Sequence, residues 1–407
     1  MTEIRKKPKL NLNFYDALFM LLLITTFYFT RNIICRLMML VFFGYTCLKF
    51  ILKNNKIKFT PFFFFSFLFI LYGALNIVAG NVIDNDVAKT MVISLTLNLL
   101  MTFCIVQYIY LSKNVYKILK ITETSIFIAA MIVVLLSIET ITEGRLGGGT
   151  DMNSNKLGIL CCSAIILCLY FMSEYKGNKI FNIAKIAFYL LLILLTGSRK
   201  SLLMVLFAFI LWSIIKGPKV FLTFIASGIF VFILLYVILM KIPLFYNIIG
   251  HRFEAFFEFF ETNTTEDKSI IDRQALIEIG WQYILKKPWT GYGYDCFKTV
   301  SGLGWNGGFF YYSHNNYIEL LFGGGILGFS LYYLSILYLL ISLIKKVKWD
   351  NSIKFLLIIL ISKLIIEYVY VSCFERIDSY LIAILVGVTL SVKKEDKKAQ
   401  GAVLCHP

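Results

Sequence analysis

The chain has 407 residues, of which 59% are hydrophobic and only 16% are charged, and it carries 38 phenylalanines and 24 tyrosines. This composition argues against a soluble globular protein and against a transmembrane β-barrel, whose strands alternate in polarity over about ten residues. Long apolar runs indicate an all-α polytopic membrane protein. The formal net charge of +16 requires no nucleic-acid partner, because membrane proteins concentrate Lys and Arg in their cytoplasmic loops.

The N-terminal segment is basic and is followed by no small-residue cleavage site, so we expect it to lead into a retained first helix. A window of about 20 apolar residues then predicts about twelve transmembrane helices. In chain order they cover residues 14–30, 33–52, 60–78, 90–110, 121–138, 157–174, 181–196, 201–215, 219–240, 315–343, 353–371 and 380–392.

Lysine clusters recur in every second connection between these predicted helices. The intervening connections include residues 80–89, 139–156 and 372–379, which are neutral or acidic overall. Because Lys and Arg accumulate on the cytoplasmic side, we expect both termini to be cytoplasmic and residues 1–407 to form a single membrane domain. The clusters lie at residues 53–58, 113–120, 176–179, 216–219 and 345–348, and the predicted cytoplasmic tail is 393–407.

One predicted outer connection, residues 241–313, is too long and too polar to be a simple connector. Its segment HRFEAFFEFFE, residues 251–261, is amphipathic and predicts a helix on the membrane surface. A second helix is predicted to end at Pro288, and it carries Arg273 and Trp281 on one face.

Several arginines fall on the outer face of this topology, against the usual bias. Arg199 lies with Lys200 in the tight link TGSRKS between two apolar helices. Charged side chains at such depth mark a substrate path or a paired partner, or they extend to lipid headgroups. Arg376, between Glu375 and Asp378, is explained equally well by a structural ion pair. They include Arg145, Arg199, Arg252, Arg273 and Arg376.

Several cations that converge on one outer site require a polyanion, and arginine binds phosphate oxygens through paired hydrogen bonds. Since the surroundings are apolar, a lipid that carries a diphosphate fits both features. The outer loop EGRLGGGTDMNSNK adds Arg145, three glycines that permit close backbone approach, and the amides of Asn153 and Asn155. This loop is suited to cradle phosphate groups or sugar hydroxyls.

The segment SHNNYIELLFGGGILGF, residues 313–329, begins a predicted helix with polar side chains. His314 lies at its outer mouth and titrates near neutral pH, which suits a proton-transfer group, although a hydrogen-bonded interfacial histidine has the same pattern. Asn315 and Asn316 are either helix caps or substrate contacts. Glu319 pairs with Asn315 or with an outer arginine.

The glycines of this segment indicate packing. Gly324 and Gly328 have the small-xxx-small spacing that lets a neighbouring helix approach closely. We therefore assign Gly323, Gly324, Gly325 and Gly328 to packing and not to chemistry.

Four motifs, in this order, resemble those of the O-antigen ligase and Wzy polymerase family of bacterial membrane glycosyltransferases. RLGGGTDMNSNKLG resembles its Arg…Asn loop, TGSRKSLL its Ser-Arg link, RQALIEIGWQYILKKPWTGYGYDCF its Arg…Trp…Pro-x-x-Gly-x-Gly segment, and HNNYIELLFGGGILGF its His-Asn-x-Tyr helix. The first 130 residues or so resemble the family only in being hydrophobic spans. The resemblance implies a GT-C-like membrane fold with a large, partly helical extracytoplasmic loop, in the bacterial plasma membrane.

The resemblance also implies a reaction, namely transfer of a glycan from an undecaprenyl-diphosphate carrier to an acceptor sugar hydroxyl on the extracytoplasmic face, with no cofactor or metal. In it, His314 is the expected general base, and Arg199 and Arg273 are expected to stabilise the departing diphosphate. Direct attack implies inversion at the anomeric carbon. A flippase and a chain-length regulator are the implied protein partners. The candidate substrate-binding residues are Arg145, Asn153, Asn155, Lys200, Trp281, Asn315, Asn316, Tyr317 and Glu319.

Several alternatives stay open at this point. We favour a polymerase of capsular or O-antigen polysaccharide, and an O-antigen-type ligase differs from it chiefly in the acceptor. A flippase is the rival of a different class, but it predicts inverted repeats and interrupted helices, which the sequence does not show. Asp84 and Asp86 form the Asp-x-Asp pattern of metal-dependent sugar transferases, and we assign this short match to the ordinary acidity of an outer loop.

Overall fold

The computed structural model of the chain describes residues 5–6, 8, 10–29, 32–53, 56–137, 145–147, 152–176, 179–243, 246, 250, 254, 268–302 and 311–394. Helices dominate these ranges, as the composition predicts. In chain order the elements are β1 (Arg5–Lys6), α1 (Phe14–Tyr28), α2 (Ile33–Lys53), α3 (Pro61–Val78), α4 (Asn85–Ser112), α5 (Val115–Leu136), α6 (Ser154–Glu174), β2 (Tyr175–Lys176), α7 (Lys179–Leu195), α8 (Arg199–Lys216), α9 (Pro218–Lys241), α12 (Lys268–Lys286), α13 (Phe297–Ser301), α14 (Asn316–Lys346), α15 (Asn351–Ile366) and α16 (Arg376–Ser391).

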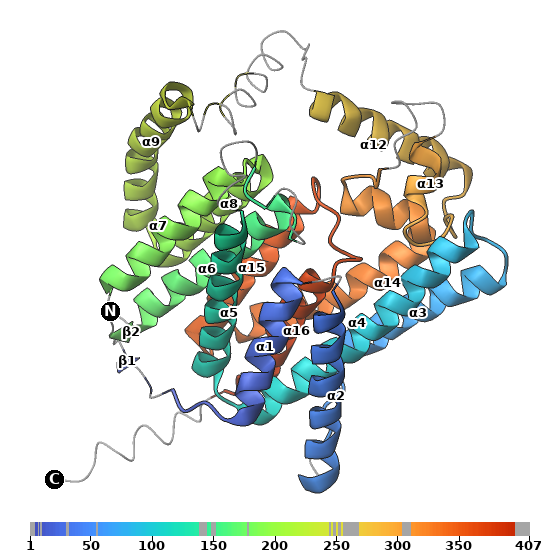
Figure 1. The fold of residues 1–407 in the computed structure, drawn as a ribbon, viewed down its shortest axis with the longest axis horizontal. Helices are drawn as coiled ribbons and strands as arrows, with labels where there is room; N and C mark the ends of the chain where they lie inside the picture. Colours follow the sequence, from blue (N-terminus) through green and yellow to red (C-terminus); the bar gives the residue numbers. More distant parts are fainter. Residues whose placement is uncertain are drawn as a thin grey trace.

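Each predicted transmembrane range coincides with one helix, α1 to α9 and α14 to α16 (Figure 1). Within the described part of the chain, six helices are long and apolar enough to cross a membrane, namely α2 to α6 and α14. An all-α integral membrane architecture is thereby confirmed. The number of twelve spans, and the assignment of cytoplasmic and outer faces, stay predictions.

Side-chain caps explain two helix starts that differ from the hydropathy pattern. α4 begins before its predicted start because Oδ1 of Asp84 accepts hydrogen bonds from the N–H groups of Asp86 and Val87, at 3.1 Å each. Asn114 caps α5 in the same way. Asp84, the first residue of the Asp-x-Asp pattern, is therefore a helix N-cap.

The two short strands connect distant parts of the chain. β1 and β2 pair in parallel, Arg5 with Tyr175 and Lys6 with Lys176. This places the N-terminal segment beside the link between α6 and α7, as Figure 1 shows. The predicted topology puts both segments in the cytoplasm, and their pairing agrees with a position on the same side.

α6 is the central helix of the bundle, since every side chain from Leu157 to Phe171 is buried. Figure 1 shows it among α5, α7, α8 and α15. Gly158 lets α8 approach so closely that an added Cβ would overlap the hydroxyl group of Ser201. This contact fixes the start of α6 against the start of α8, where the predicted cationic site lies.

The predicted outer connection 241–313 contains α12 and α13, and α12 matches the predicted helix that ends at Pro288. α12 packs against α14. The predicted amphipathic stretch 251–261, apart from Glu254, lies outside the described residues, as does the tail from residue 395 onward.

α14 is broken in its N-terminal part at Gly325, whose backbone has φ = 59° and ψ = −166°. The segment PWTGYG, which begins at Pro288, runs along the break and takes over backbone hydrogen bonds. The N–H of Ile326 donates to the carbonyl of Pro288 at 2.8 Å, and the N–H of Gly293 donates to the carbonyl of Gly323 at 2.8 Å. The outer segment is therefore joined to α14 backbone to backbone.

Glycines on both segments make this approach possible. An added Cβ at Gly325 would overlap the carbonyl group of Trp289, and one at Gly291 (φ = 67°) would overlap the backbone of α14. Gly324 lies against the ring of Tyr294. The glycines therefore serve packing, as the sequence predicts, but much of that packing is against the outer segment and not against a neighbouring helix.

We expect Gly325→Ala to destabilise the fold. Alanine at φ = 59° costs about 1–3 kcal/mol of backbone strain, and its Cβ must also displace Trp289. The thermal unfolding midpoint in detergent should fall. Gly44→Ala in α2 is the matched control, because nothing lies within 4 Å of its added Cβ and alanine favours a helix. Equal midpoints for the two variants would contradict the role assigned to the break.

Candidate active site

The start of α8 is held by the loop that precedes α6. Arg145 donates through Nε to the carbonyl of Thr196 at 2.6 Å and through Nη2 to Oδ1 of Asn155 at 3.3 Å. The same oxygen of Asn155 accepts from the hydroxyl of Ser198 at 3.0 Å. Asn153 caps α6 by accepting from the N–H of Asn155 at 2.8 Å. The two predicted motifs, the Arg…Asn loop and the Ser-Arg link, thus lie side by side.

Lys200 follows Arg199 at the start of α8 and is the more buried of the two, with 5% of its surface exposed. Its Nζ donates to the carbonyl of Val369 at 3.3 Å and lies 5.0 Å from the centre of the Tyr370 ring. Arg199 is half-buried. The cation that this link directs into the protein is therefore Lys200.

His314 occupies a tight turn immediately before α14, with a left-handed backbone (φ = 56°) that is uncommon for a residue with a side chain. The hydroxyl of Ser313 donates to the carbonyl of Asn315 at 2.8 Å, and Oε2 of Glu319 accepts from the N–H of Ser313 at 2.9 Å. The ring of Tyr312 lies 4.2 Å from the imidazole, centre to centre. Glu319, a predicted site residue, therefore fixes the backbone of the histidine turn.

The first residues of α14 are tied to neighbouring segments. Asn315 caps the helix, its Oδ1 accepting from the N–H of Tyr317 at 2.9 Å, and the Tyr317 hydroxyl donates to a carbonyl of α15 at 2.9 Å. Asn316 is completely buried, and its Oδ1 accepts from the N–H groups of Ser372 and Cys373 at 3.0 Å each. These three predicted site residues hold the start of α14 in place.

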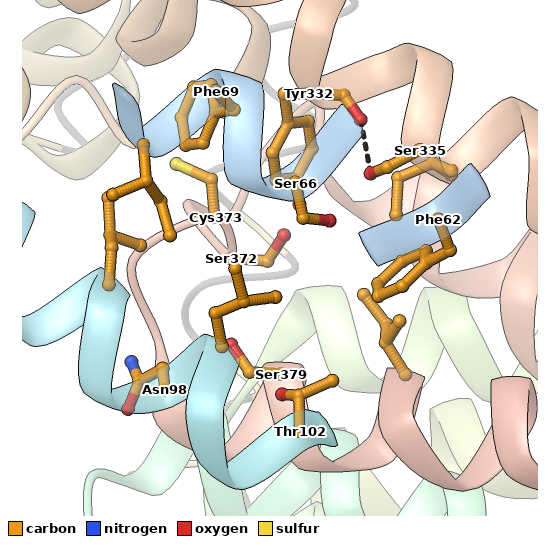
Figure 2. A pocket seen from close by; sticks show the side chains of 15 residues that line it. Phe62, Ser66, Phe69, Asn98, Thr102, Tyr332, Ser335, Ser372, Cys373 and Ser379 are labelled. Carbon is orange, nitrogen blue, oxygen red and sulfur yellow. Dashed lines mark hydrogen bonds between the residues drawn. The ribbon is translucent and has the colours of Figure 1, made fainter. Parts of the chain in front are cut away.

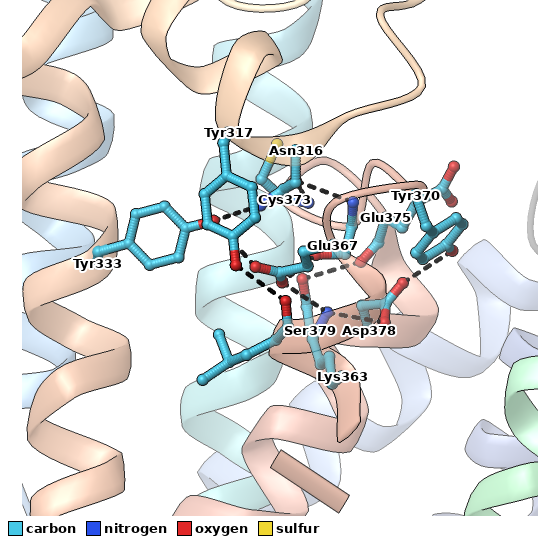
Figure 3. A network of polar contacts seen from close by, with 12 residues as sticks. Asn316, Tyr317, Tyr333, Lys363, Glu367, Tyr370, Cys373, Glu375, Asp378 and Ser379 are labelled. Atoms are coloured by element: carbon cyan, nitrogen blue, oxygen red, sulfur yellow. Dashed lines mark hydrogen bonds and ion pairs between the residues drawn. The ribbon is translucent and has the colours of Figure 1, made fainter. Parts of the chain in front are cut away.

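A buried ionic network continues from Asn316 (Figure 3). Its Nδ2 donates to the hydroxyl of Tyr333 at 3.1 Å, and that hydroxyl donates to Glu367 at 2.9 Å. Glu367 pairs with Lys363 at 3.2 Å, and Lys363 also pairs with Asp378 at 3.0 Å. Each ion in this network has an opposite charge beside it, which offsets the cost of removing it from water.

The same ionic network also contacts Lys200. The Tyr370 hydroxyl donates to Asp378 at 2.9 Å, and the Tyr370 ring contacts Lys200. The sequence reading missed these residues. Lys363 and Glu367 lie within a predicted span, and charge inside a span is a sequence signal for a functional or paired residue. Their partners come from other segments, so the sequence does not reveal the network itself.

His314 lies where positive charge gathers. Burial, with the charges of Arg273 and Lys200, lowers the pKa of His314 from 6.5 to about 3. Its Nδ1 is buried and has no hydrogen-bond partner among the described residues. The charges of Arg273 and Arg145 act on Lys200 as well. The structure therefore brings four residues from four segments into one region, with the histidine neutral at physiological pH.

Other predicted residues lie apart from this region or outside the description. Trp281 is on the exposed side of α12. Arg376 donates through Nε to Oδ1 of Asn98 at 3.2 Å, and Glu375 pairs with a lysine of α6 at 2.7 Å. Arg252 lies outside the described residues.

A cavity of about 70 Å³ lies between α3, α4, α14 and α16 (Figure 2). Ser372 and Cys373, which hold Asn316, form part of its wall together with Phe69 and Asn98. None of the described residues that line it is a cation, so it borders the scaffold of α14 and is not the anion site. In the described part of the chain, no three His, Cys, Asp or Glu side chains gather as metal ligands.

Residues 184–333 match the model of the O-antigen ligase family, and no curated protein matches the chain. The matched segment runs from α7 into α14 and contains Arg199, Lys200, Arg273 and His314. This part of the chain is therefore similar to that family, in agreement with the resemblance of the three motifs that lie within or overlap it.

We expect Asn316→Leu to destabilise the protein strongly, since leucine has the same branching and number of heavy atoms but leaves the buried N–H groups of Ser372 and Cys373 without their acceptor. Each such group costs about 1–3 kcal/mol. The thermal midpoint in detergent should fall much further than for Asn153→Ala, which removes an exposed helix cap worth about 1 kcal/mol. A smaller effect for Asn316→Leu than for Asn153→Ala would contradict the scaffold role of Asn316.

Proposed function

We propose that the chain is a glycosyltransferase that polymerises polyprenyl-diphosphate-linked oligosaccharide repeat units at the outer face of the bacterial plasma membrane, building capsular or O-antigen polysaccharide. The observation that carries this proposal is His314, whose lowered pKa keeps it neutral and whose buried Nδ1 has no partner among the described residues, near the cations Lys200 and Arg273. A neutral imidazole can accept a proton from a hydroxyl, and clustered cations bind a diphosphate.

The proposed chemistry is direct displacement. A glycosyl diphosphate already carries a good leaving group, so the site needs charge stabilisation more than acid catalysis. Arg273 and Lys200, with Arg145 and Arg199 from the adjoining loop and link, stabilise the charge that develops on the departing diphosphate. His314 takes the proton of the acceptor hydroxyl as its oxygen attacks the anomeric carbon from the opposite face. One C–O bond forms while the other breaks, so the configuration inverts, and no metal takes part.

The low pKa of His314 has a direct consequence for this scheme. An imidazole with a pKa of about 3 is a weak base, and Brønsted behaviour favours a pKa nearer the working pH. A bound diphosphate places negative charge beside the histidine and offsets Arg273 and Lys200. Opposite charge raises a histidine pKa, so donor binding strengthens the base.

A ligase is the second candidate, because the matched family is that of the O-antigen ligases. It would transfer finished polymer to another acceptor with the same chemistry. The surface glycan of a deletion strain separates the two. Single repeats left on the carrier support the polymerase, and intact polymer left on the carrier supports the ligase. Repeats trapped inside the cell would overturn both in favour of a flippase.

His314→Gln should reduce polymer synthesis in isolated membranes by at least about a hundredfold, the usual contribution of a general base. Glutamine keeps a hydrogen-bonding side chain but cannot accept the proton at neutral pH. Donor binding should survive, because the cations lie on other segments. Glu278→Gln, on the exposed side of α12, is the control and should keep its activity. A rate near wild type for His314→Gln, at equal protein level, would remove the histidine as the base.

The pH profiles should separate the free and the donor-bound site. The acid limb of kcat/KM reports the free protein, and we expect it well below pH 6.5, because the pKa of His314 is lowered. The acid limb of kcat should lie at higher pH, since it reports the donor complex. Lys200→Met should shift the limb of kcat/KM upward by removing one of the charges that lowers the pKa. A limb of kcat/KM at or above pH 6.5 in the wild type would contradict the assignment.

A further inference from the structure

An exposed apolar stripe runs along the C-terminal half of α12 and the turn that follows it. Trp281, Leu285 and Trp289 are 47%, 75% and 62% exposed. The spacing of four residues places Trp281 and Leu285 on one side of α12, and Trp289 follows in the turn after the helix. Apolar side chains of this size that gather in one place, and remain exposed, mark an interaction surface.

The end of the stripe is fastened to helices that are long and apolar enough to cross the membrane. The Tyr72 hydroxyl of α3 donates to the carbonyl of Trp289 at 3.3 Å, and the N–H of Leu327 in α14 donates to it at 3.4 Å. Leu75 and Val78, at the same end of α3, are exposed, as is Leu327. The outward-facing apolar surface of α3 and α14 therefore continues onto α12.

The length of α14 locates this junction relative to a bilayer. From Ile326 to Lys346 the helix is about 30 Å long at 1.5 Å per residue, which is the thickness of the hydrocarbon core. The break at Gly325 thus coincides with the outer boundary of the hydrocarbon. Trp289, bonded beside the break, lies at the depth where tryptophan is enriched in membrane proteins.

Polarity changes along the exposed side of α12 in the direction that a membrane boundary predicts. Lys286 and Gln282, beside the stripe, are exposed, whereas one to two turns toward the N-terminus the exposed residues are Gln274 and Glu278. Ile271, a further turn away, is the exposed apolar residue of that half. Tryptophan rings with a flanking lysine suit the lipid headgroup region, where the rings meet acyl chains and the ammonium group meets phosphates.

We propose that the C-terminal half of α12 is a membrane-interface anchor, with Trp281, Leu285 and Trp289 inserted among the headgroups and upper acyl chains of the outer leaflet and with Lys286 directed to lipid phosphates. Only the N-terminal half of the helix then stands in water. Because Arg273 lies on the same rigid helix, eight residues or about 12 Å before Trp281, the anchor also sets the height of Arg273 above the lipid. Trp281 was predicted from the sequence to bind substrate, and the anchor gives it a different role.

Fluorescence quenching in proteoliposomes tests the anchor. A fluorescent amino acid replaces Leu285 in one full-length protein and Glu278 in another, and both are reconstituted into vesicles of phosphatidylcholine and phosphatidylglycerol. We expect a lipid with a nitroxide near the top of its acyl chain to quench position 285 several-fold more strongly than position 278. Aqueous iodide should show the reverse order. Both side chains are exposed, so the replacements leave the core intact.

The remaining outcomes overturn the proposal. Strong iodide quenching at both positions, with none from the lipid nitroxide, would place the stripe in water. Protection of position 285 from both quenchers would mean that protein covers it. Accessibility to iodide that is lost only when acceptor oligosaccharide is added would return the stripe to substrate binding. None of these outcomes depends on whether the chain acts as a polymerase or a ligase.

Discussion

Backbone N–H and C=O groups at membrane depth must be hydrogen-bonded within the protein, and α14 meets this constraint by sharing its bonds with another segment. The break at Gly325 frees backbone groups that the turn between Pro288 and Gly293 takes up. Because that turn follows α12 directly, the same bonds fix α12 against the outer part of α14. The separation between Arg273 on one helix and His314 at the start of the other therefore depends on a junction that carries no chemistry itself.

Buried charge is handled in two different ways on either side of this framework. Around Lys363 opposite charges lie in direct contact, so the network is satisfied internally and serves as scaffold for Asn316. Lys200, by contrast, contacts a carbonyl oxygen and an aromatic ring. A buried cation with neutral partners attracts an incoming anion more strongly than one already neutralised, because the surrounding dielectric is low. The difference separates the part of the molecule that holds its shape from the part that is suited to bind.

The helices could be predicted from local properties of the sequence. The features that the sequence did not predict depend on contacts between residues far apart in the chain. Apolar runs located each of the long helices, since hydropathy is read over consecutive residues. The sequence singled out Arg199 as the cation of the site. Successive side chains of a helix point about 100° apart, so only one of two neighbours faces inward, and in the fold that residue is Lys200. From the sequence, Asn315 and Asn316 are equally good candidates for a helix cap. In the structure Asn316 accepts a hydrogen bond from Ser372, which lies 56 residues away, so sequence spacing does not identify this partner.

Under the proposed function, one set of cations performs two tasks in sequence. While the site is free, burial keeps the pKa of His314 low, and Arg273 and Lys200 lower it further, because protonation would add a positive charge near them. An acceptor hydroxyl that arrives first therefore meets a weak base. When a diphosphate binds, its charge offsets the same cations, the imidazole becomes more basic, and the hydroxyl can be deprotonated as the anomeric carbon is attacked. Donor binding thus precedes activation of the acceptor, and the proposed order follows from the charge that the donor brings to the site.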